Sequence, residues 1–101
     1  MGWATYAIEA LQRGETVTIR PHGDSMRGRV NDEDRVTLKP AHLEQLAVGD
    51  VILVRVRGNI YLHLIKARNG NRFLIGNNRG RINGWVGPNA VYGVATDIEP
   101  S

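Results

Sequence analysis

Apolar and polar residues alternate in short runs along most of this chain, and only the N-terminal segment has the spacing of a helix. Apolar residues between Thr5 and Arg13 form a partial face, Thr5 can cap the first turn, and Gly14 stands where a helix is expected to stop. Residues 5–13 therefore predict one short helix.

The rest of the chain, residues 14–98, is predicted to be rich in β-strands. The expected strands are Thr16–Arg20, Asp34–Lys39, Val51–Arg57, Asn59–Arg68, Arg72–Ile75 and Ala90–Ile98, with one helical turn at Ala41–Leu46 and an irregular crossing at Trp85–Pro88. The Asn69-Gly70 step is typical of a hairpin. Short strands with regular turn residues predict a mostly β fold of coiled antiparallel sheets with one N-terminal helix.

Composition limits the classes of protein that fit. A length of 101 residues predicts a single domain over residues 1–101. The absence of cysteine excludes disulfides and thiolate metal sites, and a net charge of +3 is only a mild basic excess. No apolar run approaches the ~20 residues that span a bilayer, and the N-terminus lacks the pattern of a signal peptide. We therefore expect a soluble, cytoplasmic domain without a cofactor or metal.

The most informative stretch is Gly23-Asp24-Ser25-Met26, which follows the strand predicted at Thr16–Arg20. The break at Pro21–Asp24 delivers Ser25 at a strand end or in a turn, where its hydroxyl can stand clear of the backbone. Gly23 allows close approach of a substrate backbone, and Met26 offers a flexible apolar side chain for a neighbouring pocket. An ordinary turn is the alternative interpretation, because these residues are common in turns.

A serine hydroxyl needs a base to act as a nucleophile at neutral pH, and the chain has three histidines. His22 and His42 lie in polar segments and are expected to be solvated. His63 interrupts an apolar strand and shares a face with Tyr61, so it is expected to be at least half buried. A core histidine satisfied by hydrogen bonds is the alternative. Lys66 is expected on the opposite face of the strand.

Several motifs in the same order resemble the catalytic domain shared by signal peptidase I and the self-cleaving LexA and UmuD proteins. Besides Gly23-Asp24-Ser25-Met26, they are Asp32-Glu33-Asp34-Arg35-Val36, the run from Val48-Gly49-Asp50 to Val54, Leu74-Ile75-Gly76-Asn77-Asn78, and Val91-Tyr92-Gly93-Val94-Ala95. The strand that holds His63 takes the place of the general base in that family. Most bacterial relatives have lysine there, whereas signal peptidases of the endoplasmic-reticulum type carry histidine.

The resemblance implies a serine endopeptidase in which Ser25 is the nucleophile and His63 is the base, with Gly23, Asp24, Met26 and Asn77 in support. Asn77 stands where the family has an aspartate, and it is expected to orient His63 without adding negative charge, which predicts slow turnover. Ser25-Met26-Arg27-Gly28 replaces the common Ser-Met-x-Pro. The expected partner is a peptide or protein substrate, and relatives of the LexA type suggest a homodimer by analogy.

Other functions stay open at this level. Positive charges cluster around the predicted hairpin and the following loop, at Lys66, Arg68, Arg72, Arg79 and Arg81. They could track a phosphate backbone, or they could simply be a solvated edge that resists sheet association. The alternatives to the peptidase are a catalytically inactive module that binds peptide or nucleic acid, and a regulator from a phage or mobile element derived from a self-cleaving repressor.

Overall fold

The computed structural model describes residues 3–101 and contains one α-helix and one seven-stranded antiparallel sheet. The mostly β fold predicted from the sequence is confirmed, and Met1 and Gly2 of the predicted domain lie outside the described residues. The elements are α1 Trp3–Gln12, β1 Val17–Ile19, β2 Arg35–Pro40, η1 Leu43–Gln45, β3 Val51–Val56, β4 Asn59–Asn69, β5 Arg72–Gly76, β6 Ile82–Val86, η2 Pro88–Ala90 and β7 Val91–Glu99.

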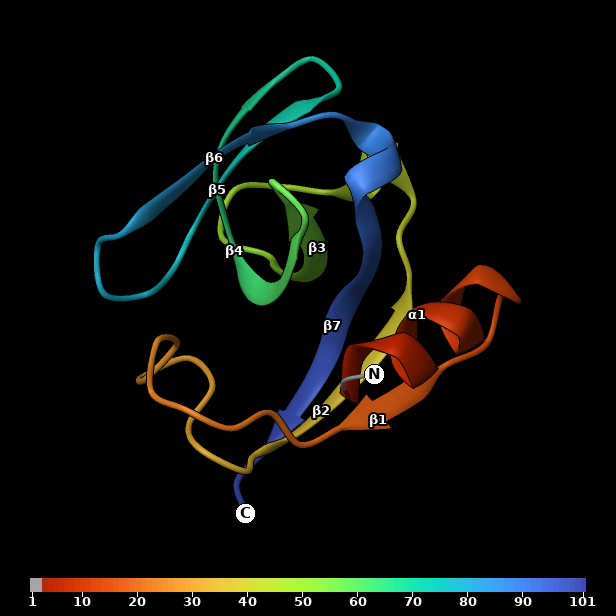
Figure 1. Ribbon diagram of the computed structural model, residues 1–101, viewed down its shortest axis with the longest axis vertical. Coiled ribbons are helices and arrows are strands. Elements are labelled where there is room, and N and C mark those ends of the chain that lie inside the picture. Colours follow the sequence, from red (N-terminus) through yellow and green to blue (C-terminus); the bar gives the residue numbers. More distant parts are fainter. Residues whose placement is uncertain (1–2) are drawn as a thin grey trace.

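The helix begins at Trp3, so Thr5 lies inside it and does not cap it. It ends as predicted: Gly14 adopts a φ of 83°, and the N–H groups of Gly14 and Glu15 donate to the carbonyls of Leu11 and Ala10. Figure 1 shows α1 lying against β1 and β2, at the opposite end of the sheet from β5 and β6.

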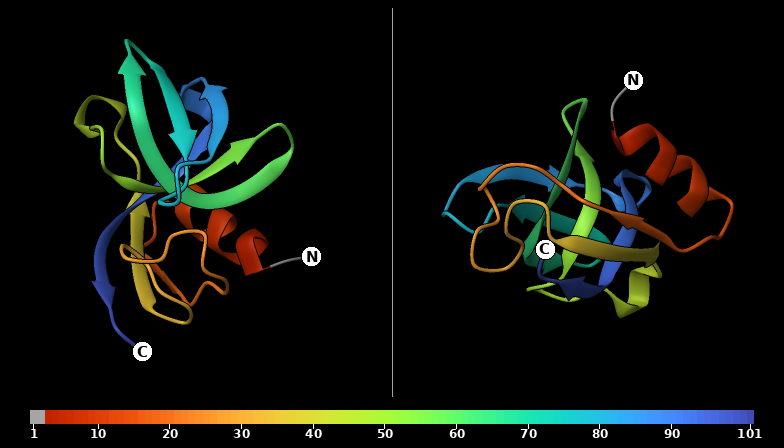
Figure 2. Two further views of the ribbon diagram at one scale, coloured as in Figure 1. Left: turned by 90° about the vertical axis from the view of Figure 1, so that its left-hand side faces the viewer. Right: turned by 90° about the horizontal axis from the view of Figure 1, so that it is seen from below.

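The strand order is β1-β2-β7-β3-β4-β5-β6, which places the last strand of the chain inside the sheet, third from one edge. β7 pairs with β2 on one side and with β3 on the other, and so joins the two halves (Figures 1 and 2). Register shifts interrupt four of the pairings, at β2–β7, β3–β7, β4–β5 and β5–β6. Such irregularities increase local twist, which agrees with the coiled shape of the sheet.

The sheet buries two hydrophobic clusters on opposite faces, and β3 contributes to both. Val51 and Leu53 belong to the cluster under α1, whereas Ile52 and Val54 belong to the cluster under β5 and β6. Side chains alternate along a strand, so an uninterrupted apolar run is what a strand covered on both faces requires. β4 divides in the same way, with Leu62 and Leu64 on the first side and Ile65 on the second.

One expectation for the second half of the chain was wrong. Trp85–Pro88 was expected to cross irregularly, but residues 82–86 form β6, an edge strand that pairs with β5. Glycine inside a strand usually weakens it, and the bulge at Asn83 interrupts the alternation, so residues 82–86 lack the regular pattern of a strand. The strand matters for the site because it carries Asn83.

Candidate active site

The segment between β1 and β2 presents Ser25 on an exposed turn held by its own polar groups. The N–H of Gly23, at a φ of 106°, donates to Asp32 Oδ1 over 2.8 Å, and the N–H of Val30 donates to the carbonyl of Met26 over 2.8 Å. Asp34 is buried and accepts the N–H of Asn31 over 2.8 Å. Met26 is also buried, so the turn is anchored in the core next to the exposed serine.

The end of β5 fixes this turn from the other side. Asn78 donates its backbone N–H to the carbonyl of Ser25 over 3.1 Å and its side-chain Nδ2 to the carbonyl of Arg27 over 2.8 Å. A Cβ at Gly28 would stand 3.2 Å from Asn78 Nδ2, and Gly28 has a φ of 97°. Glycine after Arg27 therefore fits a left-handed backbone that proline could not adopt.

Ser25 and His63 meet across 38 residues of sequence. Ser25 Oγ lies 3.4 Å from His63 Nε2, a long hydrogen bond. The ring of His63 stacks on Tyr61 with centroids 4.6 Å apart, and only 5% of the residue is exposed. The structure therefore brings Ser25 and His63 together, and it confirms that His63 is buried and shares a face with Tyr61.

The partner of the second ring nitrogen is Asn83, which sequence reasoning missed. Asn83 Oδ1 lies 2.7 Å from His63 Nδ1. An amide oxygen only accepts hydrogen bonds, so Nδ1 carries the proton and Nε2 presents its lone pair to Ser25. Asn77 was expected in this role, but its Oδ1 accepts the N–H groups of Arg79 and Arg81 over 2.8 and 3.0 Å. Asn77 shapes the neighbouring turn and does not hold the ring.

A bulge in β6 explains why Asn83 reaches the ring. Ile75 pairs with Gly84 and Gly76 pairs with Ile82, which leaves Asn83 as the extra residue between them. A bulge redirects a side chain out of the regular alternation. No short-range pattern marks Asn83 as the partner of a histidine 20 residues earlier, because the register of two strand pairs decides the contact.

Lys66 is the extra residue of a second bulge, since Ile65 pairs with Ile75 and Ala67 pairs with Leu74. The strict alternation that placed Lys66 opposite His63 is therefore interrupted. The positive charges of Lys66 and Arg81 both act on the imidazole. The hydrogen-bond partner of Ser25 Oγ is nevertheless His63 Nε2, and not Lys66.

Burial is the main reason that the pKa of His63 lies below its ordinary value of 6.5. The charges of Arg81 and Lys66 lower this pKa further, and the hydrogen bond to Asn83 opposes them. His63 is therefore neutral at pH 7. A neutral imidazole with its free lone pair toward a serine hydroxyl is the state that a general base requires.

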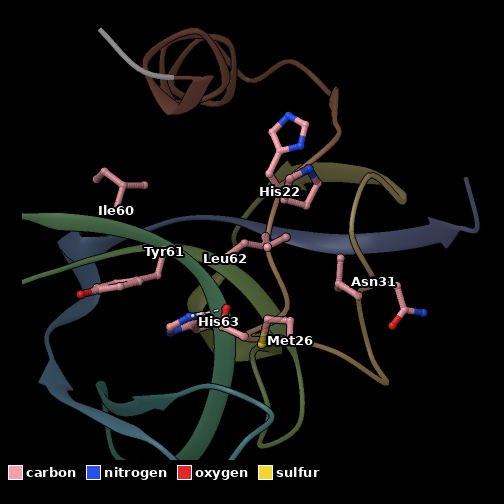
Figure 3. A pocket seen from close by; sticks show the side chains of 11 residues that line it. His22, Met26, Asn31, Ile60, Tyr61, Leu62 and His63 are labelled. Carbon is pink, nitrogen blue, oxygen red and sulfur yellow. Dashed lines mark hydrogen bonds between the residues drawn. The ribbon is translucent and has the colours of Figure 1, made fainter.

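A cavity of about 160 Å³ opens beside the pair, with Ser25, Met26, Tyr61 and His63 in its lining. Figure 3 shows Met26, Tyr61 and His63 around it, with a dashed line at His63 for the hydrogen bond to Ser25. Gly23 and His22 also line it. His22 and His42 are both exposed, as expected.

Residues 4–83 match the family model described as Peptidase S24-like. The chain belongs to this family. The match covers both Ser25 and His63, and it confirms the resemblance to the LexA and UmuD superfamily of serine peptidases. Membership supports a peptidase-like or repressor-derived domain. No curated protein matches the chain.

The basic residues of this S24-like chain do not form one free surface. Arg79 Nη1 pairs with Asp24 Oδ2 at 2.9 Å, across the turn that carries Ser25. Arg68 stacks on Phe73 and donates to the carbonyls of Leu46 and Gly70. Two members of the predicted basic edge are thus engaged in internal contacts, and Asp24 supports the turn through Arg79.

The described residues contain neither a cluster of metal ligands nor a membrane-spanning helix. Within residues 3–101, no three histidine, aspartate or glutamate side chains gather where they could ligate a metal. None of the helices in that range is long and apolar enough to cross a membrane. The cytoplasmic location and the homodimer stay predictions.

Proposed function

We propose that this chain is a serine peptidase that cleaves peptide bonds with a Ser25–His63 dyad. The observation that carries the proposal is the 3.4 Å approach of Ser25 Oγ to His63 Nε2, with Nδ1 protonated and held by Asn83. Burial and a lowered pKa keep the imidazole neutral. Membership of the S24-like family supports a peptidase-like domain on independent grounds.

In the proposed reaction, His63 Nε2 takes the proton of Ser25 as Oγ attacks the substrate carbonyl. The backbone N–H of Ser25 donates to no acceptor within residues 3–101, so it is available to hold the oxyanion. The imidazolium then gives its proton to the leaving amine, and the C–N bond breaks to leave an ester on Ser25. A water that loses its proton to His63 hydrolyses this ester and restores the serine.

Two features predict slow turnover. The long hydrogen bond between Ser25 and His63 must shorten for proton transfer. Asn83 fixes the tautomer of the ring but brings no negative charge to stabilise the imidazolium. The substrate is expected to bind as an extended peptide along the cavity beside Ser25.

The test compares cleavage of a peptide library by the wild-type chain and by Ser25→Ala and His63→Ala variants. Ser101→Ala is the matched control because Ser25 and Ser101 are the only serines, and His42→Ala is the control for the exposed histidines. Cleavage should be lost in the first two variants and kept in the two controls. Unchanged cleavage in Ser25→Ala would disprove the dyad.

A fluorophosphonate probe gives a second readout, because it forms a covalent bond with an activated serine. Mass spectrometry should find the adduct on Ser25 and not on Ser101. Absence of both cleavage and labelling would favour an inactive binding module. In that case, oligonucleotide binding with a steep salt dependence would point to the remaining basic residues.

A further inference from the structure

Three neighbouring hollows share lining residues around the Ser25–His63 pair. The cavity of about 160 Å³ shares Ser25, Tyr61 and His63 with a second hollow of about 210 Å³. The second hollow shares Tyr61, Arg81 and Asn83 with a third of about 180 Å³. Ser25 lines two of these hollows, and we name the three together the Ser25 groove.

The two ends of the Ser25 groove differ in chemistry. The first cavity, which Figure 3 shows, has polar lining residues such as His22 and Asn31 but also an apolar wall, after which we call it the apolar arm: Met26, Val30, Ile60 and Leu62. The other end carries Arg57 and Arg81, and we call it the arginine arm. Among the described residues, no carboxylate lines any of the three hollows.

Both arginines of the arginine arm are exposed and have no anionic partner among the described residues. Within residues 3–101 neither forms an ion pair, in contrast to the neighbouring Arg79, which is paired with Asp24. The backbone N–H of Arg81 donates to Asn77 Oδ1, and its carbonyl accepts the N–H of Asn77. The backbone of Arg81 is thus fixed at the rim by the turn that follows β5.

Arg57 occupies an unusual backbone position. It has a φ of 52° in the tight turn between β3 and β4, where glycine, asparagine or aspartate is preferred. Its guanidinium lies against Gly84 of β6, since a Cβ built there would be 4.0 Å from Nε and Nη2. Arg57 and Asn83 line the same hollow, so the charge lies on the Asn83 side of the Ser25 groove.

We propose that the arginine arm binds a carboxylate of the substrate on one side of the scissile bond, while the apolar arm receives an apolar side chain on the other. This inference rests on the proposed peptidase function. Arginine is suited to the task because its planar guanidinium can bind a carboxylate through two hydrogen bonds. The carboxylate belongs either to an aspartate or glutamate side chain or to the C-terminus of the peptide.

The test uses internally quenched peptides that are otherwise uncharged. Each peptide carries a single glutamate or a single glutamine, placed in turn at one of the three positions before or the three positions after the cleaved bond. At pH 8, where His63 is neutral, glutamate on one side only should raise kcat/KM about tenfold over glutamine. A second series places the C-terminal carboxylate, or its amide, at the preferred position. Preference for the free acid only in this series would assign the C-terminus as the source.

The double variant Arg57→Gln/Arg81→Gln should abolish the ratio between glutamate and glutamine peptides. Arg72→Gln is the matched control, since Arg72 is an exposed cation of β5 that lines none of the three hollows. Its ratio should equal that of the wild type. Equal cleavage of the acidic and neutral peptides in both series, or a ratio that survives in the double variant, would overturn the proposal.

Binding to the Ser25→Ala chain separates this inference from the proposed function. Fluorescence anisotropy should show about tenfold tighter binding of the acidic peptide than of its glutamine or amide counterpart, and loss of the difference when Arg57 and Arg81 are also replaced. That result would support the arginine arm even if the wild-type chain cleaved nothing. Equal binding of both peptides would contradict it even if the chain were an active peptidase.

Discussion

Asn83 contacts the protonated ring nitrogen of the candidate base through a neutral amide oxygen, which adds no negative charge beside the ring. We expect Asn83→Asp to raise kcat/KM about tenfold at neutral pH, since a carboxylate stabilises the imidazolium that forms in the reaction. The gain should stay well below the ~10⁴ known for the reverse change in a serine protease, because the amide already fixes the right tautomer. Peptide cleavage over a range of pH measures both rate and pKa.

Asn77→Asp is the matched control, because Asn77 lines the same hollow but accepts only backbone N–H groups. It should change the rate and the pKa of His63 less than Asn83→Asp does. A larger effect at position 77 would mean that Asn77 orients the ring during the reaction, as the sequence first suggested.

The lowered pKa of His63 predicts a pH profile for activity. Only the neutral imidazole can accept the serine proton, so kcat/KM should be constant near pH 7 and decline on an acid limb. The midpoint of that limb should lie below 6.5, chiefly because burial disfavours the charged ring. A midpoint above 6.5 in the free enzyme would show that the charged ring is favoured at this site.

The same group links stability to pH. The unfolded chain binds a proton on His63 near pH 6.5, whereas the folded chain does so only at lower pH. The free energy of unfolding should therefore decrease as pH falls through 6.5 to the folded pKa, and this contribution should be flat below it. Urea unfolding of wild type and His63→Gln between pH 5 and 8 tests this, because the variant should lack the decrease. Parallel curves would contradict it.

At the scale of elements, the glycine at the end of β5 lets β6 approach closely enough for Asn83 to reach His63. A Cβ at Gly76 would lie 2.6 Å from the carbonyl oxygen of Arg81, closer than real contacts allow. Gly76→Ala should therefore force β5 and β6 apart and lower the free energy of unfolding by about 1–3 kcal/mol. Cleavage should drop as well, since the bulge at Asn83 sits in the same pairing.

Gly87→Ala is the control for this substitution, because Gly87 follows β6 with a φ of −87° and nothing lies within 4 Å of a Cβ there. Its stability to urea should match that of the wild type. If Gly76→Ala were as stable as Gly87→Ala, the close approach of the two strands would not matter for the fold.

At the scale of the molecule, the two clusters should unfold together because β3 and β4 contribute to both. Leu53→Ala removes a fully buried side chain from the cluster under α1 and should cost about 2–5 kcal/mol. In this variant, the protection of backbone amides against hydrogen exchange should fall by the same amount at Leu38 in one cluster and at Phe73 in the other. A loss confined to Leu38 would show two independently stable halves.

The sequence by itself determined the strand-rich fold and the helix stop at Gly14, and it placed Ser25 after a strand and His63 within an apolar one, while the pairing of these two came from the motifs shared with the LexA and UmuD proteins. These conclusions depend on local chemistry: an uninterrupted apolar run at Val51–Val54, a left-handed glycine, and a histidine on the Tyr61 face of a strand. Such features act within a few residues, so the order of amino acids expresses them directly.

Only the tertiary structure decided that Asn83, and not Asn77, holds the imidazole, and that Lys66 departs from the alternation of its strand. Both outcomes come from single-residue bulges in the pairings of β5 with β4 and β6. A shift of one residue changes the face that a side chain occupies, and the register is set by packing and by contacts such as that between Gly76 and Arg81. These contacts form between strands, so the pattern of residues along one strand does not predict them.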